Sequence, residues 1–425
     1  MLYGRWRQIA RERGHRLALR DLAAGREWSF AELAALAEAA PAVGGRVVYP
    51  QGHRAEFIFA ALRAWRGNAV VCPLEPDQEP PRVPPPPPPC CHLKTTSATG
   101  GLPRGVLFRA EQLAADVDHI VATMGLRADW PNLGVISLAH SYGFSNLVLP
   151  LLLHGIPLIL APSPLPEMVR RAAKGCPDLT LAGVPALWRA WHEARVIPPN
   201  VRLAISAGAP LPLNLERAVF EAAGLKIHNF YGSSECGGIA YDRTDIPRAD
   251  DACVGSPMQK VGVALSEDGC LQVRSRAAGE TYWPDGDDTL GGGCFQTSDL
   301  AELRDGQVYL CGRLSDQINV AGRKVSPATI ERTLREHERV KDCLVFGIPS
   351  SDADRTDVIV ACVATDGAGD TLGLKQFLLN KLPGWQVPRE WWFVDSLGAN
   401  PRGKIPRAEW RRKYLGQRPP DPLPQ

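Results

Sequence analysis

The chain has 425 residues, of which 45% are hydrophobic and 22% are charged. This composition excludes a disordered, collagen-like or coiled-coil protein, and the length predicts at least two domains. Lys and Arg number 48, and Asp and Glu number 46, so the net charge is only +2. We therefore expect no binding to nucleic acid or to an anionic membrane through charge alone.

The sequence contains eleven cysteines but no Cys-x-x-Cys pair. Its first 20 residues are rich in arginine and have no apolar core, so they do not resemble a secretory leader. We therefore expect a cytoplasmic protein with free thiols. We expect no structural metal site, because Cys90 and Cys91 alone do not match the ligand spacing of a zinc site.

One long apolar stretch occupies residues 146–161. It is shorter than the roughly 20 apolar residues that cross a bilayer, and Pro150, Gly155 and Pro157 interrupt it. We therefore expect no membrane span. The pattern favours a buried helix, a tight turn and a buried strand.

The N-terminal part of the chain alternates helix and strand signals. Ser29 followed by Glu32 is typical of a helix start. Strands are predicted at residues 46–49 and 68–74, on either side of an apolar helix at residues 57–65.

A proline-rich segment follows at residues 79–89, with six consecutive prolines at 84–89. Such a run cannot form a helix or a central strand, so it predicts a polyproline II connector. A ligand for a proline-recognising module is the alternative, but the stiff spacer is the expected role because such runs are common linkers.

From residue 93 onward the alternation of strands and helices resumes. It predicts a mostly parallel sheet covered by helices, with ligands bound where the strands end. Strands are predicted at residues 135–138, 157–160, 179–182, 201–206 and 226–230. Helices are predicted at residues 110–124 and 213–223.

The character of the sequence changes after residue 251. Short strands at 270–274, 301–304 and 307–311 predict a small β subdomain over residues 251–314. A further α/β unit begins at 315, where Ser326 and Pro327 start a helix. We therefore expect a large domain over residues 1–314 and a small domain over residues 315–425. In the small domain, strands are predicted at 343–348 and 358–365, a helix at 372–382, and a basic tail at 401–418.

Residues 95–105 form the first motif with chemical content. Hydroxyl side chains, glycines and Arg104 make a loop rich in hydrogen-bond donors, which suits phosphate oxygens. The loop is not a P-loop, because Val106 stands where the lysine would be, and this argues against a P-loop kinase or GTPase. A mobile surface loop is the alternative interpretation.

The second motif, residues 229–235, directly follows a predicted strand. Tyr231 has the shape to stack on a purine, and Glu235 has the chemistry to hold Mg²⁺ on a phosphate chain. The alternative is a strand-to-helix turn in which Glu235 is a solvated residue of the first helical turn.

Three further motifs lie in the C-terminal third of the chain. Residues 297–299 end in Asp299, whose carboxylate suits the two hydroxyls of a ribose. Residues 312–318 and 322–325 are polar and basic. Residues 400–407 place Lys404 on a Gly- and Pro-flanked loop, within reach of an anionic ligand.

Together, the order and spacing of these motifs resemble the adenylate-forming superfamily of acyl- and aryl-coenzyme A ligases, peptide-synthetase adenylation domains and luciferases. Residues 96–105 are similar to its loop Thr-Ser-Gly-Thr-Thr-Gly-x-Pro-Lys-Gly, with Ala98, Gly100 and Arg104 as the departures. Residues 231–235 resemble the motif Tyr-Gly-x-Thr-Glu. The remaining resemblances are Ser298-Asp299 to the ribose motif, Gly312-Arg313 with Asp316 to the hinge motif, and residues 401–404 to the late Gly-Lys motif.

The resemblance implies an α/β fold, with a large N-terminal domain of helix-covered, mostly parallel sheets plus a small β subdomain, and a small mobile C-terminal α+β domain. It also implies site residues, here grouped by role. The ATP-phosphate residues would be Thr96, Ser97, Thr99, Gly101 and Arg104. The adenine residues would be Gly208, Ala209 and Pro210, with Tyr231 stacking on the base, and Asn229 and Gly232 would also bind the nucleotide. The ribose or phosphate residues would be Asp299 and Arg313. The catalytic residues would be Ser234 at the α-phosphate, Glu235 at Mg²⁺, Lys404 between carboxylate and α-phosphate, and His140 at the gate of the acid pocket.

The same resemblance implies a two-step reaction. ATP converts a carboxylate to an acyl-adenylate with loss of pyrophosphate, and a thiol then displaces AMP. The small domain would turn about Ser315 between the steps and bring Gly322, Arg323 and Lys324 to the thiol. Coenzyme A is the expected acceptor, and the phosphopantetheine of a carrier protein is the alternative.

Several departures from the family pattern affect these expectations. Ser315 replaces the usual Asp or Lys at the hinge, although a small residue can still absorb a change in backbone angle. The region before the phosphate loop is short, which leaves a degenerate, non-catalytic nucleotide-binding homologue as another alternative. A core histidine is the alternative for His140. Residues 139–143 contain no acid to pair with an ammonium group, so we expect an aryl or fatty carboxylate as substrate.

Overall fold

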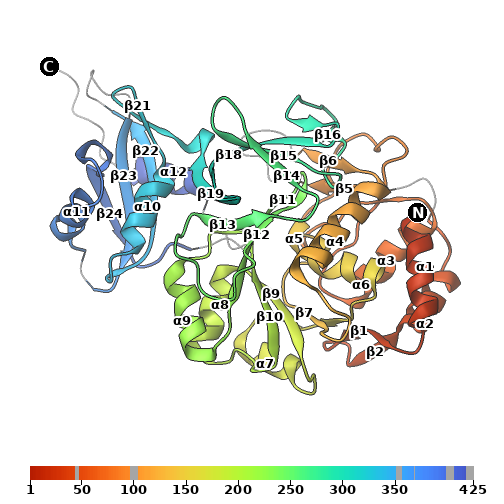
Figure 1. The fold of residues 1–425 in the computed structure, drawn as a ribbon. Coiled ribbons are helices and arrows are strands. Elements are labelled where there is room, and N and C mark those ends of the chain that lie inside the picture. Colours follow the sequence, from red (N-terminus) through yellow and green to blue (C-terminus); the bar gives the residue numbers. More distant parts are fainter. Residues whose placement is uncertain (44–46, 96–103, 351–356, 368, 399–405, 418–425) are drawn as a thin grey trace. The chain divides into compact units, whose positions relative to one another are not determined.

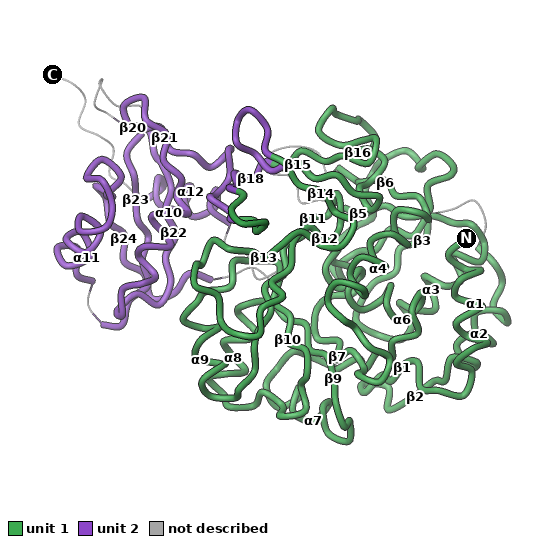
Figure 2. Tube along the Cα trace, viewed as in Figure 1, with its two compact units in different colours: residues 1–264, 272–297, 303–308 green, residues 265–271, 298–302, 309–425 purple. Residues whose placement is uncertain are grey.

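The computed structural model describes residues 1–43, 47–95, 104–350, 357–367, 369–398 and 406–417 (Figure 1). The chain forms two compact units. The first comprises residues 1–264, 272–297 and 303–308, and the second comprises residues 265–271, 298–302 and 309–425 (Figure 2). In the described part of the chain, no helix is long and apolar enough to cross a membrane.

The main sheet of the first unit is parallel at its centre. Its strands run in the order β13-β12-β11-β10-β9-β7-β8-β1-β2. Parallel pairing joins β1 to β8, β8 to β7, β7 to β9, β9 to β10 and β10 to β11. The bounds are β1 Leu17–Asp21, β2 Arg26–Ser29, β7 Asn132–Gly134, β8 Leu158–Leu160, β9 Leu179–Gly183, β10 Val201–Ser206, β11 Ile227–Ser233, β12 Gly237–Tyr241 and β13 Cys253–Pro257.

A second sheet of the first unit has the order β16-β6-β5-β4-β3. Its strands are β3 Val47–Val48, β4 Val70–Val71, β5 His92–Thr95, β6 Gly105–Phe108 and β16 Thr281–Trp283. The short β17 is Leu290–Gly291. Four strands supply residues to both units: β14 Gly262–Leu265, β15 Cys270–Arg274, β18 Cys294–Arg304 and β19 Gln307–Arg313.

Helices connect the strands of the first unit (Figure 1). They are α1 Leu2–Glu12, α2 Phe30–Ala39, α3 Ala55–Arg66, α4 Ala110–Met124, α5 Ser141–Gly143, the π-helix η1 Phe144–Val148, α6 Leu149–His154, α7 Pro166–Ala173, α8 Pro185–Glu193 and α9 Leu213–Ala223. The predicted helices 110–124 and 213–223 are confirmed. Both end at a glycine with positive φ, Gly125 at 69° and Gly224 at 63°, as left-handed helix caps require.

Local signals explain several of these elements. Ser29 caps α2 as predicted: its Oγ accepts a hydrogen bond from the amide of Glu32 at 3.2 Å, and its own amide donates to Glu32 Oε2 at 2.7 Å. The stretch 146–161 is buried helix, turn and strand, as expected. Gly155 makes the turn with a φ of 66°.

Several predicted strands have other bounds in the structure. The strand predicted at 135–138 lies earlier, in β7 at Asn132–Gly134. The apolar pattern did not indicate this position because β7 begins with a buried polar residue, Asn132, which donates to the carbonyl of Asn146 at 3.2 Å. The strand predicted at 226–230 continues to Ser233 in β11, and β12 follows after a tight turn. The alternative of a strand-to-helix turn at Glu235 is therefore wrong.

The proline-rich segment has neither helix nor strand, as predicted, but it is more than a free spacer. The carbonyl of Pro84 accepts a hydrogen bond from Trp283 Nε1 at 2.7 Å. Val83 packs against a buried cluster on the second sheet that includes Leu93 and Leu107. The segment is therefore anchored to β16 and to the sheet that carries the phosphate loop.

The second unit has a three-stranded sheet with helices on both faces. Its elements are η2 Leu314–Asp316, β20 Ile318–Val320, β21 Arg323–Val325, α10 Pro327–Arg335, β22 Val340–Pro349, β23 Asp357–Thr365, α11 Thr371–Leu379, η3 Gly384–Gln386, β24 Glu390–Val394 and α12 Arg407–Gln417. The buried residues of α10 and α11, such as Ile330 and Leu374, cover one face, and Trp410 and Tyr414 of α12 pack on the other. The helix predicted at 372–382 ends earlier, at Leu379.

Candidate active site

The predicted adenine residues gather at one edge of the main sheet. Ser206 at the end of β10 pairs in register with Gly183, the last residue of β9, and with Asn229 of β11. The loop after β10 carries Gly208, Ala209 and Pro210. This loop therefore begins beside Asn229, at the carboxyl ends of parallel strands, which is where ligands bind in such sheets.

Ser234 and Glu235 stand on the tight turn between β11 and β12. Ser233 Oγ accepts hydrogen bonds from the amides of both Glu235 and Cys236, each at 3.2 Å. At Gly232, a Cβ would come within 2.7 Å of the Gly237 carbonyl oxygen. The backbone thus holds the Glu235 turn, defined here as residues 234–236, with little room for change.

Asp116 of α4 supports this turn from within the unit. Its side chain is buried, and it accepts hydrogen bonds from the Gly238 amide at 3.1 Å and from Ser145 Oγ at 2.6 Å. A Cβ at Gly237 would lie 2.0 Å from Asp116 Oδ1. Asp116 is a functional candidate that the sequence motifs did not indicate. Its one signal is that an acidic residue stands on the apolar face of α4.

The predicted gate residue His140 lies next to the turn. Ser141, the residue after it, shares a hydrogen bond with Ser234, with 3.0 Å between the two hydroxyl oxygens. His140 is half-buried, and its Nδ1 accepts from the Tyr142 amide at 3.2 Å as the cap of α5. His140 is therefore not a core histidine, and the structure brings the predicted acid gate to the predicted α-phosphate contact.

The end of the phosphate loop reaches the same turn through β16. Arg104 lies just before β6, and its guanidinium carbon is 5.5 Å from the ring centroid of Tyr282 in β16. Tyr282 in turn donates its hydroxyl to Glu235 Oε1 at 3.4 Å. Burial, and then the negative charge of Glu235, raise the pKa of Tyr282. Arg104 also donates to Asp287 at 2.9 Å.

Glu235 suits a magnesium ion that bridges to nucleotide phosphates. Such a site needs only one or two protein carboxylates, since phosphate oxygens and water complete the coordination. Among the described residues, no cluster of three His, Cys, Asp or Glu side chains would hold a metal without a substrate. Five predicted site residues lie outside the described residues: Thr96, Ser97, Thr99, Gly101 and Lys404.

Within the second unit, the structure joins the predicted ribose residues to each other. Arg313 Nε donates to Asp299 Oδ1 at 2.9 Å. The hinge candidate Ser315 is exposed in η2, and the neighbouring Asp316 forms an ion pair with Arg407 at the start of α12. Arg407 also donates to Glu331 at 2.6 Å, so it anchors the segment that follows Lys404.

The predicted thiol-side residues form a hairpin turn in the second unit. Ala321 and Gly322 connect β20 to β21, with φ values of 52° and 81°. Two consecutive residues with positive φ are typical of a type I′ turn, which favours glycine. Arg323 and Lys324 follow in β21 with exposed side chains.

Residues 64–283, more than half of the chain, match the AMP-binding enzyme family, and residues 329–404 match the AMP-binding enzyme C-terminal domain. The chain belongs to the AMP-binding enzyme family. The resemblance to adenylate-forming acyl- and aryl-coenzyme A ligases is thereby confirmed.

Curated relatives of this family member include two aryl-acid ligases. A feruloyl-CoA synthase of Amycolatopsis sp is 27% identical over 80% of this chain and 72% of its own length. A 4-hydroxybenzoate–CoA/benzoate–CoA ligase of Rhodopseudomonas palustris is 28% identical over 76% of this chain, and the match covers 64% of that relative.

Solved structures confirm the fold. ATP-bound MatB from Rhodopseudomonas palustris matches with a TM-score of 0.84 and 21% identity, over 97% of this chain and 98% of that one. The o-succinylbenzoate CoA synthetase MenE from Bacillus subtilis, solved with its acyl-adenylate OSB-AMP, matches with a TM-score of 0.81 and 19% identity, over 96% and 97%. The predicted adenylate-forming fold is therefore correct.

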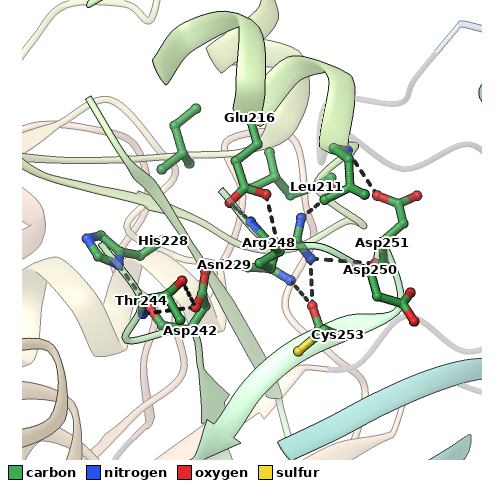
Figure 3. A network of polar contacts seen from close by, with 12 residues as sticks. Leu211, Glu216, His228, Asn229, Asp242, Thr244, Arg248, Asp250, Asp251 and Cys253 are labelled. Carbon is green, nitrogen blue, oxygen red and sulfur yellow. Dashed lines mark hydrogen bonds and ion pairs between the residues drawn. The ribbon is translucent and has the colours of Figure 1, made fainter. Parts of the chain in front are cut away.

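This AMP-binding enzyme has a buried ionic network that contacts the end of the loop after β10 (Figure 3). Arg248 donates to Glu216 of α9 at 2.8 Å, to the Leu211 carbonyl at 2.6 Å and to the Cys253 carbonyl at 2.6 Å. Asn229 donates to the same Cys253 carbonyl at 3.3 Å. Arg248 thus ties the end of the loop after β10 to β13 and, through Cys253, to Asn229.

Lys226 completes the network from the start of β11. Its ammonium group pairs with Glu216 and donates to Asp242 at 2.6 Å, and all three side chains are buried. Burial alone would raise the pKa of Asp242, but the hydrogen bonds from Lys226 and Thr244 lower it overall. The sequence analysis missed this network because its members are far apart along the chain.

Proposed function

We propose that this protein is an ATP-dependent acid–thiol ligase that activates an aryl carboxylate as an acyl-adenylate and transfers the acyl group to coenzyme A. One observation carries the proposal above all. The hydrogen bond between Ser141 and Ser234, at 3.0 Å, joins the predicted acid gate to the predicted α-phosphate contact. Both reactants of an adenylation step would therefore meet at one place.

In the first step, an oxygen of the carboxylate attacks the α-phosphorus of ATP, and the bond to pyrophosphate breaks. Such a reaction needs positioned charge rather than a protein nucleophile. Ser234 donates a hydrogen bond to the α-phosphate, and Lys404 bridges the carboxylate and that phosphate. Glu235 would hold Mg²⁺, which supplies neutralising charge when bound.

In the second step, the thiol of coenzyme A attacks the acyl carbon, and AMP leaves. Asp299 and Arg313 hold the ribose, and the hairpin turn with Gly322, Arg323 and Lys324 serves the thiol side. Ser315 acts as the hinge. These roles rest on the family motifs and on the positions described above.

The structure adds an acidic group near the gate that the local sequence lacks. Ser137, three residues before His140, donates its hydroxyl to both carboxylate oxygens of Glu75, at 3.0 and 2.9 Å. A carboxylate retains further acceptor capacity after such bonds. A carboxylate acceptor favours aryl acids that carry a hydroxyl or amino donor on the ring. Three relatives are named for such acids: ferulate, 4-hydroxybenzoate and anthranilate.

A pyrophosphate-release assay over a panel of acids tests the proposal. The panel compares benzoate, its hydroxy and amino derivatives, fatty acids and amino acids, each with and without coenzyme A. We expect continuous turnover with a substituted benzoate and coenzyme A, and one equivalent of pyrophosphate per site without it. Nucleotide binding without acid-dependent release from any acid would instead indicate a non-catalytic homologue.

A further inference from the structure

A buried lysine lies just before the phosphate loop in the sequence and, among the described residues, has no hydrogen-bond partner. Lys94 lies in β5, and only 4% of its surface is exposed. Among the described residues, no hydrogen-bond acceptor lies within reach of its ammonium nitrogen. The nitrogen stands 4.5 Å from the ring centroid of Phe108 in β6, a cation–π contact that replaces only part of its hydration.

Packing connects the sheet face of Lys94 with the Glu235 turn. Lys94 pairs in register with Val106 of β6, so their side chains share one face of the sheet. Gly279 fills the space between this face and the turn. Its amide donates to the Glu235 carbonyl at 2.7 Å, and a Cβ there would lie 2.5 Å from Val106 Cγ1 and 3.2 Å from the Glu235 carbonyl oxygen.

The charged and titratable groups around Lys94 come from three elements. Burial lowers the pKa of Lys94, while the carboxylates of Asp116 and Glu235 and the thiol of Cys236 act in the opposite direction. His92, on the same strand, is fully buried, and burial holds its pKa well below the ordinary value. The negative charge near Lys94 therefore belongs to the Glu235 turn and to the carboxylate that supports it.

An unpaired buried ammonium group reduces the stability of a fold, and an apolar side chain of similar length would remove that cost. We propose that Lys94 is a positioning residue of the active site: its ammonium group offsets the negative charges of Asp116 and Glu235 and so holds the Glu235 turn in place for the nucleotide. The role rests on the proposed function, since it acts on the turn that carries Ser234 and Glu235.

The variant Lys94→Met tests this role because it keeps the length of the side chain and removes the charge. We expect a melting temperature equal to or above that of the parent protein. At the same time, kcat/KM for ATP should fall about tenfold, and the rise in melting temperature on adding ATP should shrink, both with and without Mg²⁺. The control is Thr180→Val in β9, which removes a buried hydroxyl that also lacks a partner; it should leave ATP binding and turnover unchanged.

A double-mutant cycle with Asp116→Asn shows whether Lys94 acts through this carboxylate. We expect the loss caused by Lys94→Met to shrink in the Asp116→Asn background, and equal losses in both backgrounds would overturn the proposal. Unchanged ATP binding and turnover in Lys94→Met, or failure of that variant to fold, would overturn it as well. Failure of the proposed function is a separate result, because the parent protein itself would then release no pyrophosphate with any acid.

Discussion

Glu235 owes its position to backbone contacts on both sides of its turn. Ser233 Oγ binds its amide, and the Gly279 amide binds its carbonyl at 2.7 Å. Among the described residues, the carboxylate itself accepts a hydrogen bond from the Tyr282 hydroxyl, at 3.4 Å. A change at the carboxylate should therefore alter the chemistry of the site without moving the turn.

The substitution Glu235→Gln keeps the shape and removes the charge. We expect the Mg²⁺ concentration for half-maximal pyrophosphate release to rise about tenfold or more, since a carboxylate is the protein ligand that Mg²⁺ prefers. The melting temperature should stay close to that of the parent protein. Tyr282→Phe is the matched control, because it removes the hydrogen bond and keeps the carboxylate. An unchanged Mg²⁺ requirement would contradict the metal role.

His92 should make the stability of the protein depend on pH. Its ring is fully buried, neither nitrogen has a partner among the described residues, and it packs 4.4 Å from the ring centroid of Phe144. Burial is the main cause of its lowered pKa. The unfolded chain therefore takes up a proton below about pH 6.5 that the folded protein does not take up, so stability falls as the pH falls.

We expect His92→Phe to remove about 1.4 kcal/mol per pH unit from this dependence between pH 6 and pH 5. Urea unfolding at a series of pH values measures the effect. The variant should also be more stable at neutral pH, because it removes a buried polar group without partners. A pH dependence identical to that of the parent protein would show that His92 has the same pKa in the folded and unfolded states.

At the scale of elements, the pairing of β6 with β16 connects β6, the strand that follows the phosphate loop in the sequence, to the Glu235 turn. Trp283 pairs with Gly105, and Tyr282 pairs with Val106. Gly279, just before β16, fits between Val106 and Glu235 only because it has no side chain. The spacing between β6 and the Glu235 turn therefore depends on one glycine.

The substitution Gly279→Ala should push the turn away from β6. A Cβ at 2.5 Å from Val106 Cγ1 and 3.2 Å from two carbonyl oxygens forces a shift, and small misplacements in an active site commonly lower rates by about 10²-fold. Gly291→Ala is the control, since its Cβ would meet only one atom, at 3.7 Å. Kinetics of pyrophosphate release should separate the two variants, and equal rates would contradict the role of Gly279.

The buried ionic network joins α9 to the segments around β11, β12 and β13 (Figure 3). Arg248 alone contacts Glu216, Leu211 and Cys253. A network of this kind holds elements in register, and its weakness is that the loss of one partner leaves the others buried without compensation.

We therefore expect Arg248→Met to lower the free energy of unfolding by about 3–5 kcal/mol. It should also raise KM for ATP, because the loop after β10 loses its anchor at the Leu211 carbonyl. Arg170→Met breaks an exposed ion pair with Glu167 instead and should cost less than about 1 kcal/mol. Urea unfolding compares the two variants, and similar losses would show that the network contributes little.

At the scale of the whole molecule, the predicted functional residues are divided between the two units. The first unit holds the Glu235 turn and the loop after β10, and the second holds Asp299, Arg313 and the hairpin turn at Gly322. The second unit also ties Arg407 to Asp316 and Glu331 by ion pairs. Arg407, three positions after Lys404 in the sequence, is thus held in the second unit.

If Lys404 serves only the first step, its loss should separate the two half-reactions. We expect Lys404→Ala to lower acid-dependent pyrophosphate release by about 10²–10³-fold, as the loss of a fixed charge at a developing phosphate charge does. Thioester formation from an acyl-adenylate supplied in advance should remain within a few-fold of the parent rate. A similar loss in both assays would contradict the assignment.

The sequence by itself was enough for features that depend on neighbours along the chain. The helices at 110–124 and 213–223, the Ser29–Glu32 cap and the order of the nucleotide motifs are set by periodicity, capping and turn chemistry within a few residues. Family membership followed from the same local motifs. These signals involve residues that are close together along the chain, so they can be recognised from the sequence alone.

Only the tertiary structure showed which distant residues support the site. Asp116 lies 122 positions from Gly238, and Glu75 lies 62 positions from Ser137. Lys94 is connected to the Glu235 turn through its strand partner Val106 and through Gly279. The tertiary structure also excluded the strand-to-helix alternative at Glu235, because a turn between β11 and β12 stands there. Such contacts form between elements that pack together, and no periodicity within either segment specifies its partner.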